Sequence, residues 1–323
     1  MKNFPLVSIL TPCYNGEKFL DNYFSDILKQ DYPNCELIFM DDGSSDGTKE
    51  KVDFYREQVE RKGYILRYLY HDNIGLGGTI AVGIKYVKGD YVVWPDCDDR
   101  LYPNWISRKV EYLENHLDYG VVRTNGIIIN EKGEFLKDVV RQKIDPLHVN
   151  LFEDYLFGRN AWLQPISFMI RMSAFDAANP GRYIYPTRRG QDWQMLLPVL
   201  YKYPCGYIDE KLFEYVVHSG SLSSSVGENF EKKIVKQRMF CEIIENTIKH
   251  MDIPDADLYL RKIRIYYLRT YITTAFLYDR KKEAREYYSE LKSLNAFDWK
   301  SAIKVFGTGV LGFKKIYFKL VGK

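Results

Sequence analysis

The sequence is poor in cysteine and has no pattern that would pair the cysteines it contains. Five of them, Cys13, Cys35, Cys97, Cys205 and Cys241, are scattered over 323 residues without a CxxC motif. Isolated cysteines are typical of free thiols in a reducing compartment, and they argue against a disulfide framework. We therefore expect a cytoplasmic protein.

Long hydrophobic runs are also missing. No apolar stretch approaches the roughly 18 residues of a membrane span. Residues 1–5 lead directly into an apolar strand pattern, so we expect no signal peptide. The formal net charge of +3 is too small to indicate nucleic-acid binding, and no nucleic-acid partner is predicted.

Short apolar runs and helical patterns alternate through the first hundred residues. Strands are predicted at 6–10, 36–40, 64–70 and 91–94, with the first stopped by Thr11 and Pro12. Helices are predicted between them, at 17–30, from a cap at Ser44 or Ser45 to about 61, and up to about 87. This order is typical of βαβ units, so we predict an α/β fold with a Rossmann-like, mostly parallel sheet.

The rest of the chain continues this pattern and then changes character. We predict a helix at 103–116, strands at 120–130, 165–171 and 213–217, and a helix at 192–203, while 141–164 remains unassigned. After about residue 228 long helical patterns dominate. The expected organisation is therefore one domain over 1–225 and a helical region over 226–323.

Three carboxylates follow the fourth predicted strand within four positions. Asp96, Asp98 and Asp99 would lie at the carboxyl end of that strand, where open α/β sheets bind ligands. Closely spaced carboxylates repel one another unless a cation lies among them, and oxygen ligands of this kind suit Mn²⁺ or Mg²⁺. The alternative is a solvated turn, because Asp is common in turns.

Two other polar clusters follow the first and second strands. Tyr14, next to Pro12 and Asn15, could stack on a nucleotide base, or it could be a buried turn tyrosine. Asp42 could accept a hydrogen bond from a base N–H, or it could serve as a helix cap. The glycines of residues 75–78 do not match the dinucleotide fingerprint G-x-G-x-x-G, so we interpret them as a turn and helix entry.

Four motifs occur in order along the first hundred residues: VSILTPCYNG at 7–16, DDGSSDGT at 41–48, NIG at 73–75 and DCDD at 96–99. Together they resemble the family-2 glycosyltransferases of the GT-A fold. Gln191 and Asp192 extend the resemblance to about residue 225, and the last hundred residues lie outside it. The resemblance implies inverting transfer of a sugar, usually from a UDP-sugar, with Mn²⁺ or Mg²⁺.

The resemblance also implies roles for individual residues. The nucleoside would be held by three of them: Pro12, Tyr14 and Asp42. Asn15 belongs to the same nucleotide-sugar-binding group, as do Asp96 and Asp98, the DxD pair that also contacts the metal. His218 resembles a late histidine near the diphosphate and is a candidate metal ligand.

Asp192 would be the catalytic base. A single carboxylate at a helix start, separate from the metal cluster, suits the deprotonation of an acceptor hydroxyl, although helix starts favour Asp in any protein. The family often has Ala-Arg-Asn after its Asn-x-Gly turn. Here residues 78–80 are Gly, Thr and Ile, so a basic donor contact from that loop is not expected.

Two other functions compete with this interpretation. A sugar-nucleotide pyrophosphorylase would carry a glycine- and arginine-rich loop after the first strand, where this chain has Pro12–Asn15. A non-catalytic carbohydrate-binding protein on a transferase fold would not need Asp96, Asp98 and Asp192. We therefore predict a hexosyl- or N-acetylhexosaminyltransferase that acts on a glycan or lipid-linked glycan acceptor in cell-envelope polysaccharide synthesis.

The stretch Trp299–Lys323 contains six lysines, several large apolar residues and no carboxylate. Residues 313–320 could form a short amphipathic helix with Phe313, Ile316, Tyr317 and Leu320 on one face. Such a face suits an anionic membrane surface, which would place the protein peripherally at the inner side of the membrane. The alternative is a helix packed on the transferase domain or on a second subunit.

Overall fold

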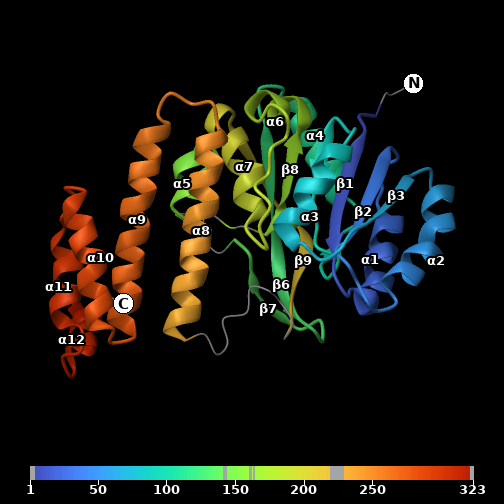
Figure 1. The fold of residues 1–323 in the computed structure, drawn as a ribbon. Helices are drawn as coiled ribbons and strands as arrows, with labels where there is room; N and C mark the ends of the chain where they lie inside the picture. Colours follow the sequence, from blue (N-terminus) through green and yellow to red (C-terminus); the bar gives the residue numbers. More distant parts are fainter. Residues whose placement is uncertain (1–3, 141–143, 160–161, 163, 219–228, 321–323) are drawn as a thin grey trace. The chain divides into compact units, whose positions relative to one another are not determined.

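The computed structural model describes residues 4–140, 144–159, 162, 164–218 and 229–320. The chain divides into two compact units, Met1–Leu222 and Ser223–Lys323, and each is described here by itself. Figure 1 shows the elements of both.

The first unit alternates strands and helices, as the sequence pattern predicts. In chain order its elements are β1 (Val7–Cys13), α1 (Glu17–Lys29), β2 (Cys35–Asp41), α2 (Thr48–Arg61), β3 (Ile65–Tyr70), α3 (Leu76–Gly83), η1 (Ile84–Tyr86), β4 (Tyr91–Val93), β5 (Arg100–Leu101), α4 (Trp105–Asn115), β6 (Val121–Asn130), β7 (Phe135–Asp138), α5 (Phe152–Leu156), η2 (Pro165–Ser167), β8 (Phe168–Arg171), α6 (Met172–Ala178), α7 (Gln191–Lys202) and β9 (Cys205–Val217).

The described strands form one sheet in the order β3-β2-β1-β4-β8-β6-β9-β5, with β7 paired to β6. The N-terminal part of the sheet is parallel: β1 pairs with β2 and β4, and β2 pairs with β3. The strand β8 runs antiparallel to both of its neighbours, β4 and β6, so the sheet is mixed beyond β4. The predicted α/β fold with a Rossmann-like sheet is confirmed.

The register of the first strands brings their carboxyl ends to one edge of the sheet. Cys13 at the end of β1 lies opposite Asp41 at the end of β2, and the amide of Asp42 donates to the Cys13 carbonyl over 2.8 Å. The prediction that Thr11 and Pro12 stop the first strand is wrong, because β1 continues to Cys13. Pro12 is tolerated there because β4 pairs only with Val7–Ile9, so no ladder bond to β4 is lost.

Close packing of helices on the sheet buries both faces of β1 and β2. Every residue of these two strands is buried, and Phe24 of α1 stacks on Phe39 of β2 with ring centroids 6.0 Å apart. On α3, a Cβ at Gly83 would lie 1.9 Å from the Met40 sulfur. Glycine at this position therefore lets α3 lie directly against the strands.

Several local predictions differ from the structure. The helix α2 begins after Gly47 rather than at a Ser44 or Ser45 cap, since Asp46 accepts the Thr48 amide over 3.1 Å. The strand β9 runs over 205–217 instead of 213–217 because it pairs with β6 along its length. Short elements such as β5 and α6 were not predicted, since two to seven residues carry too little periodicity.

The second unit is helical in its described residues. It contains α8 (Phe230–His250), α9 (Ala256–Leu277), α10 (Lys281–Ser293), α11 (Trp299–Gly307) and α12 (Phe313–Leu320). Figure 1 shows α8 and α9 running antiparallel. The core of the unit is α9, which packs against α8, α10 and α11 through buried residues such as Leu268 and Ile272. Of the helices in the described ranges, none has the length and apolar character needed to cross a membrane.

Candidate active site

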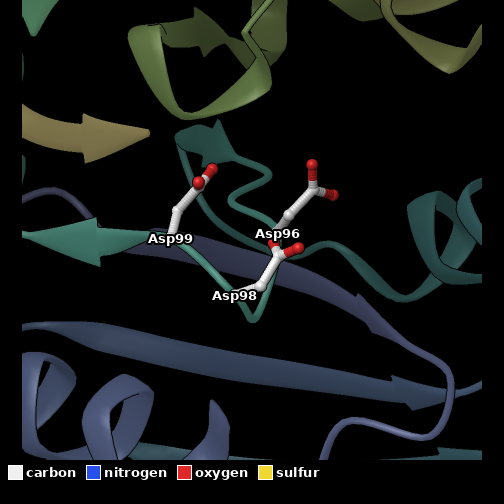
Figure 2. Close-up of side chains that lie close together, drawn as sticks. All are labelled: Asp96, Asp98 and Asp99. Atoms are coloured by element: carbon white, nitrogen blue, oxygen red, sulfur yellow. The ribbon is translucent and has the colours of Figure 1, made fainter. Parts of the chain in front are cut away.

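The three carboxylates predicted to bind a metal lie together on the turn that follows β4. Figure 2 shows the side chains of Asp96, Asp98 and Asp99 projecting from this turn. One carboxylate oxygen from each lies within 4.8 Å of the others, so a single cation could contact all three. The turn stays at the edge of the sheet because the chain leaves β4 after Val93, level with Ile9 of β1.

Burial makes this cluster costly without a cation. Asp99 is 2% exposed, and its Oδ1 accepts the Val216 amide over 3.0 Å, while its buried Oδ2 has no hydrogen-bond partner. Burial, followed by the charge of Asp98, raises the pKa of both Asp96 and Asp99 well above the usual value. A buried carboxylate oxygen without a partner, next to two other carboxylates, fits a hard divalent cation such as Mn²⁺ or Mg²⁺.

His218, the candidate metal ligand, lies beside the cluster. Its Nε2 is 2.7 Å from Oδ2 of Asp98, although 120 residues separate the two in sequence. The imidazole also packs against the ring of Phe19, with centroids 5.0 Å apart. These contacts hold His218 against Asp98, from where it can reach an anionic ligand or the same cation.

Asp192 stands at the start of α7, with Gly190 before it in the left-handed conformation at φ 81°. The indole Nε1 of Trp94 donates to its Oδ1 over 3.1 Å. Burial raises the pKa of Asp192 to about 7, although the Trp94 hydrogen bond acts in the opposite direction. A carboxyl group with a pKa near neutrality is suited to general-base catalysis.

Trp94 was not predicted as part of the site. It is 1% exposed and stacks on Phe168 with centroids 6.0 Å apart, so its ring is held in a fixed position. In the sequence it looks like the last apolar residue of a strand. The only signal that could have identified it is its place directly before the acidic turn.

The predicted nucleoside side of the site lies at the ends of β1 and β2. Tyr14 is 54% exposed, so the alternative of a buried turn tyrosine is wrong. Pro12 is buried within β1. Asn15 adopts a positive φ of 49° and joins the loop after β1 to the loop after β2. Its backbone N–H donates to Ser44 Oγ over 2.8 Å, and its side-chain Oδ1 accepts the backbone N–H of Ser45 over 2.9 Å.

Asp42 organises the loop that follows β3. Its two carboxylate oxygens accept the amides of Ile74 and Gly75 over 2.7 and 2.9 Å. Its backbone carbonyl accepts Nδ2 of Asn73 over 3.0 Å. Nδ1 of His71 also lies 3.4 Å from Oδ1, and Asp42 is only 5% exposed, so little of the carboxylate is open to a ligand. The helix cap that we considered for Asp42 is therefore not its role.

Two thiols lie between the nucleoside side and the acidic turn. The sulfurs of Cys13 and Cys97 are 3.3 Å apart and buried, and all five cysteines are free thiols. A Cβ at Gly16 would lie 2.2 Å from the Cys13 sulfur, so a glycine is needed where α1 begins beside this pair. The contact holds the Asp96–Asp99 turn against the end of β1.

The arrangement thus joins three chemical functions at one edge of the sheet. An exposed aromatic ring and Asp42 lie on one side, a carboxylate cluster suited to a cation lies after β4, and Asp192 lies next to Trp94 on α7. This combination can bind an anionic, base-containing ligand and remove a proton from a group held near Asp192.

Relatives with similar sequences are described as glycosyltransferases. An uncharacterized glycosyltransferase of Rickettsia typhi is 27% identical over 295 residues, which cover 86% of each chain. Two other Rickettsia relatives, from R. felis and R. conorii, are also 27% identical, and this chain spans only 38% of their length.

Solved structures share the fold. The TarS 1–349 structure of S. aureus, in complex with UDP-GlcNAc, superposes with a TM-score of 0.60 at 16% identity, covering 99% of this chain and 92% of that one. The mannosyltransferase PcManGT of Pyrobaculum calidifontis, in complex with GDP-Man and Mn²⁺, gives a TM-score of 0.57 at 15% identity over 99% and 84% of the two chains.

The described strands and helices of the first unit agree with the fold of these solved structures. The sequence profile named "Glycosyl transferase family 2" matches residues 8–179, which is more than half of the chain. This protein belongs to glycosyl transferase family 2.

Proposed function

We propose that the protein transfers a hexosyl or N-acetylhexosaminyl group from a UDP-sugar, with inversion, to a glycan or lipid-linked glycan acceptor in cell-envelope polysaccharide synthesis. The observation that carries this proposal is the convergence of two acidic elements from different segments of the chain. Asp96, Asp98 and Asp99 gather on one turn, and Asp192 of α7, with a pKa of about 7, lies near enough for its charge to add to burial and Asp98 in raising the pKa of Asp96. The UDP-GlcNAc and GDP-Man bound by the two solved neighbours support a nucleotide-sugar donor.

In this proposal Asp96, Asp98 and Asp99 hold Mn²⁺ or Mg²⁺, with His218 beside Asp98. When bound, the cation offsets the negative charge that develops on the diphosphate leaving group. Tyr14 and Asp42 hold the nucleoside at the ends of β1 and β2. These residues orient the donor so that its anomeric carbon faces Asp192.

Asp192 acts as the base in this proposal. Glycosyl transfer passes through an oxocarbenium-like transition state, and inversion requires one base on the face opposite the leaving group. The carboxylate accepts the proton of the acceptor hydroxyl as that oxygen attacks the anomeric carbon. The Trp94 indole donates to Oδ1, so in this proposal Oδ2 is the oxygen that accepts the proton.

Family membership favours this function over the two alternatives. A pyrophosphorylase would require a glycine- and arginine-rich phosphate loop directly after β1, where Tyr14 and Asn15 follow Cys13, the last residue of the strand. A non-catalytic binding protein would not need a half-buried Asp192 whose pKa lies near neutrality.

A nucleotide-release screen tests the proposed function. Purified protein with Mn²⁺ or Mg²⁺ is offered UDP-glucose, UDP-galactose, their N-acetyl forms and GDP-mannose, and free nucleoside diphosphate is measured with and without candidate glycan acceptors. We expect acceptor-dependent release from one UDP-sugar, with an inverted linkage in the product by NMR. Folded protein that releases nucleotide from none of the donors contradicts the proposal.

We predict that activity falls in acid because Asp192 must be deprotonated to act as a base. Its pKa is raised to about 7, so the protonated form dominates below that pH, and kcat/KM should decrease tenfold per pH unit there. A bound cation favours the carboxylate and would move this inflection below 7. A pH–rate profile measures it.

Trp94→Phe is the matched variant for this profile. It keeps an aromatic ring but removes the hydrogen bond that lowers the Asp192 pKa. The inflection should therefore move to higher pH. A profile that is flat between pH 5 and 8 in the wild type, or unmoved in Trp94→Phe, contradicts the role of Asp192.

We also propose that the α11–α12 region contacts an anionic membrane surface, in a form that differs from the predicted one. Tyr317 is 8% exposed and packs on Phe276 of α9 with centroids 5.4 Å apart, so it faces inward. Lys314 bonds to the Leu277 carbonyl over 2.9 Å. This packing on α9 lies within the helical unit itself, so it differs from the alternative that the sequence left open, and it removes Tyr317 from the predicted face.

The exposed apolar side chains lie mainly before α12. Phe306 at the end of α11 is 78% exposed, Leu311 is fully exposed, and Val310 and Ile316 are also exposed. Lys315 and Lys319 are exposed on α12. Apolar groups that enter the headgroup region and lysines that face anionic lipids suit a membrane surface.

Vesicle co-sedimentation tests this surface. We expect binding to vesicles that contain phosphatidylglycerol, weaker binding in high salt, and a loss of roughly tenfold or more for the double variant Phe306→Glu, Leu311→Glu. Leu117→Glu is the control, since Leu117 is an exposed leucine of the first unit. Equal binding by the double variant and the wild type, or by neutral and anionic vesicles, contradicts the proposal.

A further inference from the structure

A row of large side chains runs from Asp192 across one face of the sheet. Trp94, which donates to Asp192, stacks on Phe168 of β8 with ring centroids 6.0 Å apart. Phe168 lies opposite Arg123 of β6, and Arg123 lies opposite Tyr207 of β9. Residues opposite each other on adjacent strands project from the same face of the sheet. At Arg123 the row has thus moved two strand spacings, roughly 10 Å, away from the proposed base.

Arg123 is a buried cation without a carboxylate partner. The side chain is 2% exposed, and among the residues that the structure describes it forms no ion pair and leaves Nε and Nη1 without a hydrogen bond. A buried charge is costly unless another group compensates for it. The compensation here comes mainly from two aromatic rings, since the guanidinium lies 4.2 Å from the ring centroid of Trp162 and 5.8 Å from that of Tyr207. Arg123 therefore holds these rings in place.

The indole of Trp162 is fixed by two further contacts. Its Nε1 donates to Ser167 Oγ over 2.9 Å, and the backbone carbonyl of the residue accepts the Tyr155 hydroxyl over 3.2 Å. The carbonyl of Tyr155 in turn accepts the indole N–H of Trp193, the residue after the proposed base, over 3.1 Å. Together with the guanidinium of Arg123, these contacts hold the indole in one orientation and tie it to the helix that carries the base.

The surface that remains on Trp162 has the character of a carbohydrate subsite. The residue is partly exposed although several contacts hold it. The ring of Tyr207 stands edge-on beside it, with centroids 5.8 Å apart, and the Tyr207 hydroxyl donates to Oδ1 of the exposed Asp209 over 2.8 Å. A carboxylate accepts through both oxygens, so Asp209 retains acceptor positions. A sugar ring suits such a place, because its C–H face packs on a fixed aromatic ring while its hydroxyl groups bond to acceptors at the edge.

Resting on the proposed function, we propose that Trp162 binds a sugar ring of the acceptor that lies at a distance from the reacting hydroxyl. Asp209 accepts from the hydroxyl groups of that ring, and Arg123 is a positioning residue that keeps the indole in place. Two strand spacings, roughly 10 Å, are a distance that a short run of linked sugar rings covers. The acceptor is therefore a glycan chain rather than a single sugar, with its reacting end at Asp192 and an internal ring on Trp162.

Kinetics with acceptors of different length test the proposal. The probe is the glycan acceptor that supports nucleotide release in the donor screen, offered as its monosaccharide and as oligosaccharides of increasing length. In the wild type, KM should fall once the chain is long enough to reach Trp162. Trp162→Ala should raise KM for these longer acceptors roughly tenfold, as expected when one buried apolar contact is lost, and should leave the KM of the monosaccharide and the affinity for UDP within about twofold.

Further variants separate the ring from its support. Trp162→Phe keeps an aromatic face, and Arg123→Lys keeps a cation beneath it, so both should retain part of the dependence on acceptor length. Arg123→Met removes the cation and should raise KM for the longer acceptors alone. Phe54→Ala is the control, since Phe54 is an aromatic residue of α2 that is 67% exposed. Melting temperatures show which variants fold, and the two Trp162 variants decide the proposal if Arg123→Met does not.

The outcomes distinguish this subsite from the proposed function. If Trp162→Ala raises KM equally for the monosaccharide and the longer acceptors, or weakens UDP binding in parallel, the ring supports the fold and the proposal is wrong. A wild-type KM that does not change with acceptor length also overturns the subsite, while transfer itself leaves the proposed function intact. If folded wild-type protein releases nucleotide with no acceptor, the proposed function fails, and the subsite fails with it.

Discussion

Asp192→Asn is expected to lower turnover by roughly 10²–10⁴-fold, the contribution typical of a general base. Asparagine has nearly the same shape, and its side-chain oxygen can still accept the Trp94 N–H that holds Asp192 Oδ1 over 3.1 Å. The loss would therefore reflect the missing proton acceptor rather than a rearranged site. Initial rates of UDP release at saturating donor and acceptor measure it.

Binding of the donor should be nearly unchanged in the same variant. A base acts in the transition state, so UDP affinity by calorimetry should stay within about twofold of the wild-type value. The pH–rate profile of the residual activity should also lose its inflection near 7. Near-normal turnover, or loss of UDP binding in parallel with turnover, would show that Asp192 is not the base.

Asp98→Asn is expected to abolish most of the metal dependence of nucleotide binding. Asp98 is one of three carboxylates that can reach a common cation, and it also contacts His218. Substitution of a residue that only hydrogen-bonds to a metal ligand already costs about 10–100-fold in metal affinity. Loss of a ligand itself should cost at least as much. Calorimetry of UDP with Mn²⁺ and with EDTA measures the difference.

Stability without metal gives a second readout that does not depend on activity. After burial, the charge of Asp98 is the next cause that raises the pKa of Asp96 and of Asp99, so its removal relieves repulsion among closely spaced carboxylates. Metal-free Asp98→Asn should therefore melt at a higher temperature than the metal-free wild type, and Mn²⁺ should stabilise it less. Asp118→Asn, in an exposed loop, is the control for loss of one negative charge.

Two results would remove the metal site from the proposal. One is equal UDP affinity of folded wild-type protein in Mn²⁺ and in EDTA. The other is an Asp98→Asn variant that retains the full effect of Mn²⁺ on both UDP affinity and melting temperature.

The parts of the fold that were predicted correctly depend on local patterns. Apolar runs and helical periodicity located β1 to β4 and their helices, because a strand or helix of several residues repeats its signal along the chain. The parallel order then followed, since βαβ units place successive strands side by side. The predicted end of β1 was placed too early, before Pro12. A proline can stand in this strand only because β4 does not extend alongside it, and the length of β4 cannot be read from the residues of β1.

The carboxylate turn was predictable for the same reason. Asp96, Asp98 and Asp99 are neighbours in sequence, and the rule that ligands bind at the carboxyl ends of parallel strands assigns them a place. His218 and Asp192 were singled out by resemblance, and their roles stay predictions. Their contacts, His218 with Asp98 and Asp192 with Trp94, join residues 120 and 98 positions apart.

The sequence by itself therefore determined the α/β architecture of the first unit and the acidic turn after β4, because both depend on patterns among residues that are close together in the chain. Only the tertiary structure decided how Asp192 meets Trp94, how Tyr317 packs on Phe276, and how Arg123 comes to lie against the ring of Trp162. These contacts depend on strand order, register and close backbone approach. Strand order, register and backbone approach are set only when segments far apart in the chain pack together, so they cannot be predicted from a local sequence pattern.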